Sequence, residues 1–285
     1  MVGGNKILYF RPGTLDEAVH VLATHGSQIL SGGTDFFPAL GDRPLPDSVL
    51  DVSGISEIKG ITVESDCIRI GGLTTWSQVI AAPLPRCFDA LKSAAREIGS
   101  IQIQNRATVA GNLCNASPAA DSVPPLLALD AEVELASVAR SRRLPLADFI
   151  VGNRKTLRRA DEILSRVIVP RRLDDAVSAF LKLGSRRYLV ISIAMVAAIL
   201  KTDRAGSVAA ARIAVGSCSA TAQRLTALEA ALVGAPARIG LGAQVLQEHL
   251  APLSAIDDVR GTANYRNDAA RTLIARALEA CVGSG

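Results

Sequence analysis

The stretch QIQNRATVAGNLCNASPAAD, residues 102–121, is unusual for a connection inside a compact domain. Its first residues alternate between apolar and polar side chains, which is typical of an extended segment. Residues 107–120 are then nearly all small, which predicts a loop. Long loops in compact domains are usually either functional or disordered, and the apolar residues around this one argue against disorder. We therefore expect this loop to be functional.

A second loop of small residues lies upstream, in QILSGGTDFFPAL, residues 28–40. The strand predicted at 28–30 ends at Ser-Gly-Gly-Thr-Asp, and glycines without Cβ atoms let the backbone approach another group closely. Successive backbone N–H groups in such loops can bind an anion. Two loops of this kind, from different subdomains, would hold a pyrophosphate between them. An ordinary tight turn remains the alternative for each loop taken alone.

The rest of the pattern predicts an α+β fold. Thr14 and Glu17 form a capping box for a helix at 14–26, and Gly26 ends that helix. The other expected helices lie at 74–82, 87–99, 221–234 and 267–281. The expected strands lie at 6–10, 28–30, 48–53, across 61–72, and at 131–135, 178–183, 190–200 and 208–218.

The order of these elements predicts three units. The first fifty residues form a small α/β unit, and the last third places three strands before two helices, which is typical of a separate α+β unit. The sequence changes from apolar to polar near Pro170. We therefore expect units at 1–55, 56–170 and 171–285.

The composition narrows the class of protein. The chain has 285 residues, of which 49% are hydrophobic, and its net charge of +4 comes without a basic run, so nucleic acid is not an expected partner. No leader is recognised, and the longest apolar run, 189–200, is too short to cross a bilayer and predicts a buried strand. Five scattered cysteines without a CxxC pair predict a cytoplasmic protein with no iron–sulfur, zinc or other metal site of its own.

Several enzyme motifs are missing from the sequence. There is no GxGxxG, no GxxxxGK[ST] and no GxSxG, so neither a Rossmann site, a P-loop nor an α/β-hydrolase is expected. We expect no catalytic residues within this chain.

Beyond these patterns, the sequence resembles the FAD-binding medium subunit of molybdenum hydroxylases. That family includes the carbon monoxide dehydrogenase medium subunit and the FAD domain of xanthine dehydrogenase. The resemblance runs in order along essentially the whole chain. It is carried by SGGTD (31–35), QIQNRATVAGNLCNASPAAD (102–121), RKTLRRADEILSRVIVP (154–170), AFLKLGSRR (179–187) and DDVRGTANYRNDAARTL (257–273).

This resemblance implies a two-subdomain, PCMH-type FAD-binding fold, with FAD between the first two units and a C-terminal three-stranded sheet with helices. It implies that both loops bind the cofactor. The first would line the pyrophosphate with Gly32, Gly33, Thr34 and Asp35, led in by Leu30 and Ser31. The second would form a phosphate loop from Thr108, Val109, Ala110, Gly111 and Asn112.

The resemblance also implies roles for single residues elsewhere. Ser117 would lie near the flavin, and Asp121 would bond hydroxyl groups or polar ring atoms of FAD. Leu164 would pack on the adenine or a nearby part of the cofactor. Lys182 would stand beside the flavin, where a cation stabilises the reduced ring, and Tyr188 would stack near its edge. Simpler alternatives remain: Leu164 as plain core, Lys182 facing solvent, and Asp121 as a helix cap.

The sequence departs from the family pattern at a small residue, Ala110, and at a polar residue, Gln104. Ala110 stands where the commoner loop has glycine, which requires a negative φ and room beside the phosphate. Gln104 replaces the usual arginine, and Arg106 is the alternative source of charge. Cys114 lies within the second loop, where we expect a small buried residue rather than a redox thiol.

The implied function is electron transfer within a larger complex. A molybdopterin cofactor would lie on a large partner subunit, and [2Fe–2S] clusters would lie on a small one, in a heterotrimer. Electrons would collect on FAD in this chain and leave to NAD, a quinone, oxygen or another carrier. A stand-alone FAD oxidase and a flavin-free scaffold subunit are the alternatives, although no histidine that could tether a flavin lies in either loop.

Overall fold

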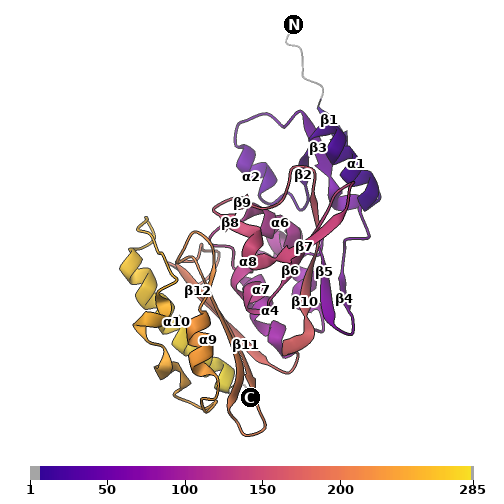
Figure 1. Ribbon diagram of the computed structural model, residues 1–285. Coiled ribbons are helices and arrows are strands. Elements are labelled where there is room, and N and C mark those ends of the chain that lie inside the picture. Colours follow the sequence, from indigo (N-terminus) through magenta and orange to yellow (C-terminus); the bar gives the residue numbers. More distant parts are fainter. Residues whose placement is uncertain (1–6, 284–285) are drawn as a thin grey trace.

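The computed structural model of the protein describes residues 7–283, and Figure 1 shows its three main sheets. The first is a parallel sheet with the strand order β1-β3-β2. Its elements are β1 (Leu8–Phe10), α1 (Leu15–His25), β2 (Gln28–Leu30), α2 (Phe36–Leu40) and β3 (Ser48–Asp51). Lys6, which the sequence assigned to the first strand, lies outside the described residues.

Helix α1 begins and ends where the sequence predicts. The Thr14 side chain accepts a hydrogen bond from the Glu17 N–H, and the Glu17 side chain accepts one from the Thr14 N–H, so the capping box is present. Gly26 ends the helix in the left-handed conformation, with φ 59°.

The second sheet is antiparallel, with the order β4-β5-β10-β6-β7. Its strands are β4 (Ile61–Val63), β5 (Cys67–Gly71), β6 (Glu132–Ala136), β7 (Ser141–Pro145) and β10 (Ile163–Pro170). The accompanying helices are α3 (Trp76–Ala81), α4 (Asp89–Glu97), α5 (Ile101–Gln104), α6 (Val109–Asn115), α7 (Val123–Ala128) and α8 (Leu146–Phe149). A small ladder joins β8 (Ile150–Gly152) to β9 (Lys155–Thr156).

The structure corrects the prediction for residues 100–120. Ile101–Gln104 is a short helix, not an extended segment, and Val109–Asn115 is helix α6, not a loop. Val109 and Leu113 are four residues apart and both buried, so they form the core-facing side of α6. The sequence prediction failed because alanine, glycine and asparagine are equally common in loops, and only the packing of two spaced apolar residues identifies the helix.

The third sheet has the order β11-β12-β13-β14 and is antiparallel. Its elements are β11 (Val177–Leu183), β12 (Ala194–Thr202), β13 (Val208–Gly216), β14 (Gln223–Arg224), α9 (Thr226–Leu232) and α10 (Ala263–Gly283). The three predicted strands are present. The two-residue strand β14 is an addition, taken from the start of the segment that was predicted as helix 221–234.

Strand β12 explains the long apolar run in the sequence. Helices α4 and α7 cover one side of the third sheet and α10 covers the other, as Figure 1 shows. Alternate β12 residues therefore enter two different cores: Ala197 and Ile199 pack with the second unit, whereas Val196 and Leu200 pack with the C-terminal helices. Of the helices between residues 7 and 283, none has the length and apolar run needed to span a bilayer.

Candidate functional site

The loop that follows β2 leaves its backbone donors free. The N–H groups of residues 32–35 donate no hydrogen bond to any residue that the structure describes. Gly33 has φ 79°, a conformation that favours glycine. Free, adjacent N–H groups form a site for an anion.

Gly32 also lets two parts of the chain approach each other closely. A Cβ atom at Gly32 would lie 2.0 Å from the carbonyl oxygen of Arg106. The missing side chain therefore lets this loop approach the chain's own backbone just before α6. The two predicted loops meet at this point, where the Ser31 and Thr108 hydroxyl oxygens are 2.8 Å apart.

The start of α6 uses its backbone donors internally. Thr108 caps the helix by accepting a hydrogen bond from the Gly111 N–H, at 3.1 Å. The N–H groups of Val109 and Ala110 donate to the carbonyls of Thr74 and Gly72, and that of Asn112 donates to Thr108. The second predicted loop is thus a helix start, and its N–H groups do not form the expected anion site.

A polar cavity of about 240 Å³ lies where these two segments meet. It contains most of the residues that the sequence assigned to the pyrophosphate. Its lining is Ser31, Gly32, Gly33, Thr34, Asp35, Phe36, Ile98, Ile103, Ala107, Thr108, Gly111 and Asn112. Leu30 and Val109 line neither this cavity nor its neighbour; Leu30 packs beneath Gly33, and Val109 is core.

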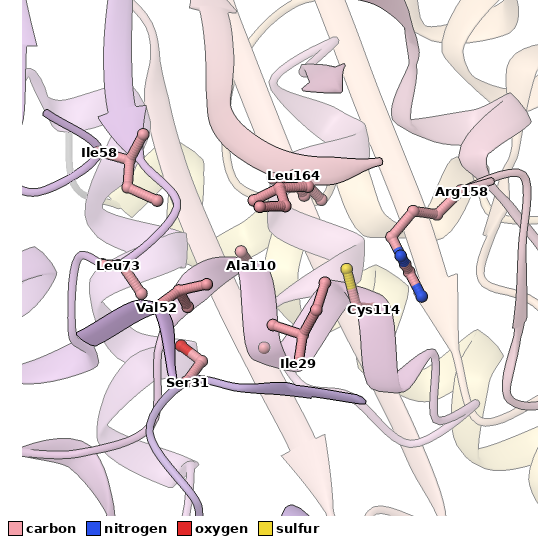
Figure 2. Close-up of a pocket in the computed structure, with 11 residues that line it drawn as sticks. Ile29, Ser31, Val52, Ile58, Leu73, Ala110, Cys114, Arg158 and Leu164 are labelled. Carbon is pink, nitrogen blue, oxygen red and sulfur yellow. The ribbon is translucent and has the colours of Figure 1, made fainter. Parts of the chain in front are cut away.

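A second, largely apolar cavity of about 100 Å³ adjoins the first and shares Ser31 and Gly111 with it. Figure 2 shows the residues around this cavity, with Val52 and Leu73 on the left, Ala110 and Cys114 on helix α6, and Leu164 above them on β10. The lining is Ile29, Ser31, Val52, Ile58, Leu73, Ala110, Gly111, Cys114, Arg158, Ile163 and Leu164. Leu164 is therefore both core, at 3% exposed, and cavity wall.

The departures from the family pattern have local explanations. Ala110 lies in α6, so its φ is negative, and its methyl group faces the apolar cavity. Gln104 is buried and donates a hydrogen bond to the Arg96 carbonyl, at 3.0 Å, so it supports the chain rather than a ligand. Arg106 is exposed and lines neither of the two cavities.

Asp121, Lys182 and Ser192 form a buried polar group where the segment before α7 meets the third sheet. The Lys182 Nζ donates to Asp121 Oδ2 at 2.7 Å, and the Ser192 hydroxyl donates to Asp121 Oδ1 at 2.5 Å. Burial raises the pKa of Asp121, and the Lys182 charge opposes that rise. The simpler alternatives for Asp121 and Lys182 are both wrong. The Asp121 side chain caps no described helix, and the Lys182 side chain is not directed to solvent.

The last two predicted residues lie away from the adjoining cavities. Ser117 lines a separate cavity of about 690 Å³, together with Ser192 and three arginines. Tyr188 is 63% exposed, and the Arg187 guanidinium lies 5.2 Å from its ring centre. The structure does not bring Tyr188 to either cavity between the first two units.

The residues of the apolar cavity that the sequence did not assign to the site include the thiol of Cys114 and the guanidinium of Arg158. Cys114 follows Ala110 by four residues in α6, so helical spacing would have placed both on one face. Burial raises the pKa of the Cys114 thiol to about 11, which keeps it protonated at neutral pH. Arg158 had no sequence signal, because it sits in an arginine pair that has the pattern of solvated surface.

Together the two cavities fit a dinucleotide such as FAD. Free N–H groups suit the pyrophosphate, and the apolar walls suit a planar ring. The shared residues Ser31 and Gly111 show that the two compartments lie next to each other. Because Gly32 has no Cβ atom, the loop after β2 packs closely against the Arg106 backbone, which brings the loop and the start of α6 together.

The relatives found by comparison with known proteins include FAD-binding domains and subunits. Residues 5–172 match the family described as "FAD binding domain in molybdopterin dehydrogenase", and residues 179–281 match the "CO dehydrogenase flavoprotein C-terminal domain". The chain is 37% identical over 236 residues to the nicotinate dehydrogenase FAD-subunit of Eubacterium barkeri, covering 80% of each chain. It is 30% identical over 283 residues to the xanthine dehydrogenase FAD-binding subunit of Escherichia coli O157:H7, covering 97% of this chain and 96% of that one.

The solved structures agree with this result. Carbon monoxide dehydrogenase from Hydrogenophaga pseudoflava contains a chain that matches with a TM-score of 0.87 and 27% identity, covering 99% of both chains. Quinoline 2-oxidoreductase from Pseudomonas putida 86 contains one that matches with a TM-score of 0.90 and 25% identity, covering 98% of this chain and 97% of that one.

Proposed function

This chain belongs to the family of FAD-binding subunits of molybdenum hydroxylases, and on that premise we propose that it is the electron-transfer subunit of such a complex. It accepts electrons from [2Fe–2S] clusters on a partner subunit and passes them from FAD to an external acceptor. When bound, FAD supplies the link between one-electron and two-electron chemistry.

One observation carries this proposal: residues 32–35, whose N–H groups have no acceptor in the described chain, line a polar cavity that adjoins an apolar one. An anion in the polar part would find donors with no competing partner in the described chain. A planar ring in the other part would displace water from Ile29, Val52 and Leu164.

We propose that Asp121 and Lys182 lie beside the ring system of the bound flavin. Lys182 would offset negative charge on the reduced cofactor, and Asp121 holds its ammonium group in place. Because Asp121 also accepts from Ser192, each of its oxygens holds one donor and keeps a further lone pair. We therefore propose that Asp121 orients Lys182 and also bonds a hydroxyl group of FAD. Ser117 and Tyr188 remain proposed flavin neighbours.

The proposed partners are a large molybdenum subunit and a small iron–sulfur subunit, in a cytoplasmic heterotrimer. The relatives include the carbon monoxide dehydrogenase medium chain of Hydrogenophaga pseudoflava, and a medium chain implies a larger and a smaller one. All five cysteines of the chain are free thiols, which supports a reducing compartment.

We also propose three units, residues 1–55, 56–170 and 171–285. Each of the three main sheets draws all its strands from one of these ranges, which supports the division. FAD would lie between the first two units.

Flavin content tests the proposed function. We would purify the chain with and without its co-expressed neighbouring subunits, and record the visible spectrum and the released flavin. About one FAD per chain is expected in at least one preparation, and this flavin should be lost on Gly33→Trp, which fills the polar cavity. A flavin-free chain in both preparations would contradict the proposal and favour a scaffold role.

A further inference from the structure

We propose that Arg158 is a specificity residue that binds the adenine ring of the cofactor and so selects a dinucleotide over FMN. This inference rests on the proposed function. It concerns the apolar cavity, in which Arg158 contributes the only charged side chain among the described lining residues.

Arg158 is held firmly, with donors to spare. It lies on the turn between β9 and β10, and its Nη1 donates to the carbonyls of Arg159, at 3.0 Å, and Glu162, at 2.7 Å. Its Nε and Nη2 have no hydrogen-bond partner among residues 7–283. An arginine guanidinium fixed at one nitrogen keeps the plane of its remaining donors fixed as well.

The buried carboxylate of Glu162 holds this turn in place. Glu162 is 2% exposed, and its carboxylate accepts from the Arg159 N–H at 2.7 Å and from Arg142 Nε at 2.6 Å. Arg142 Nη2 also donates to the Leu157 carbonyl at 2.7 Å, so both ends of the turn are tied to one side chain. The orientation of Arg158 is therefore set before any ligand arrives.

The surroundings of Arg158 favour a ring over a phosphate. Figure 2 shows the guanidinium directed toward the helix that carries Ala110 and Cys114. The rest of the lining is aliphatic, apart from the Ser31 hydroxyl group, the Cys114 thiol and the backbone at Gly111. A phosphate here would leave most of its oxygens without donors, whereas the free N–H groups of residues 32–35 lie in the neighbouring compartment.

An adenine ring satisfies both features of this cavity. Its faces suit the aliphatic walls, and its ring nitrogens accept in-plane hydrogen bonds from the free Nε and Nη2 donors. A cavity of about 100 Å³ takes part of a ligand rather than a whole one, and the rest continues past Ser31 and Gly111 into the polar compartment.

The test compares ligands with and without adenine. Full-length wild-type chain and Arg158→Leu would be titrated with FAD, FMN, ADP and adenosine. We expect the Kd values for FAD, ADP and adenosine to rise about tenfold in Arg158→Leu, while that for FMN stays unchanged. Arg158→Lys keeps the charge but not the planar donors, so it should restore only part of the affinity.

Arg159→Leu is the matched control. The Arg159 side chain donates no hydrogen bond within the described chain, and only its backbone holds the turn. It should bind all four ligands like wild type. Arg158→Leu loses two hydrogen bonds to turn carbonyls and should have a somewhat lower Tm, so all titrations are made well below the Tm of both leucine variants. FAD and ADP binding that is unchanged in Arg158→Leu overturns the inference, as does an equal loss for FMN. A wild-type chain that binds no FAD contradicts the proposed function as well.

Discussion

Two segments of this protein have similar composition and opposite backbone behaviour. Residues 31–35 and 108–112 both combine glycine, threonine and other small side chains. In the first, the N–H groups of residues 32–35 have no described acceptor, whereas in the second the N–H groups of residues 109–112 are all bonded within the chain. The composition of both segments therefore indicates a close approach to a ligand or to another part of the chain. Only the hydrogen-bond acceptors around each segment decide whether its N–H groups stay free for a ligand or begin a helix.

The largest expected effect comes from Gly32→Ala. The new Cβ would lie 2.0 Å from the Arg106 carbonyl oxygen, so the two segments would have to separate. We expect a loss of about 3 kcal/mol in the free energy of unfolding, together with loss of bound flavin. Urea unfolding and released flavin measure the two effects.

Gly242→Ala is the control for Gly32→Ala. Its Cβ would meet the Ala275 carbonyl oxygen at 2.7 Å, far along the chain in the C-terminal unit. It should lower stability but leave flavin on the folded protein. Normal flavin affinity in Gly32→Ala would show that the contact between the two segments is not needed for the site.

Thr108→Val should have the next largest effect. It removes the cap of α6 and the partner of Ser31 at once, which costs about 2 kcal/mol. Flavin affinity should fall, as measured by fluorescence titration. Thr14→Val removes the cap of α1 instead and should lose stability without losing flavin. An equal loss of flavin in both variants would mean that the contact between the segments has no specific role.

Gly33→Ala tests the free loop itself. Gly33 has φ 79°, so alanine there costs about 1 kcal/mol and disturbs the free N–H groups. Gly60→Ala is the control for backbone strain alone, because Gly60 has φ 82° and open space around its missing Cβ, whereas a Cβ at Gly33 would also lie 3.0 Å from the Phe37 ring. Both variants should melt at a lowered temperature, Gly33→Ala at least as low as Gly60→Ala, and only Gly33→Ala should release flavin. Release by both would assign the effect to stability alone.

The smallest effect is expected from Ala110→Gly, which restores the commoner family residue. Because the Ala110 N–H already donates to the Gly72 carbonyl, flavin affinity should not change, and the helix should lose about 0.5 kcal/mol. Thermal unfolding and flavin titration check this pair of outcomes. A clear gain in affinity would mean that this N–H serves a ligand, and the contrast between the two segments would no longer hold.

Much of the fold follows from short-range patterns. The capping box at Thr14, the helix end at Gly26 and the strand at 28–30 depend on neighbours within a few residues, and the structure has all three. The two segments that meet at the polar cavity were also identified from sequence. The nature of the second segment was not, because Thr108 as a cap and Val109 with Leu113 as a buried face depend on contacts with other strands.

By itself, the sequence determined helix α1 with its cap, the main strands of the three sheets, the apolar character of residues 189–200 and the location of both segments at the cavity. Only the tertiary structure decided that β12 is buried on both faces, that Asp121 meets Lys182 across 61 residues, and that Arg158 reaches the apolar cavity. The physical reason is the distance along the chain between the residues that interact. Capping and periodicity act over a few residues, whereas an ion pair, a cavity wall or a free N–H group depends on which distant atoms the packed sheets bring near it.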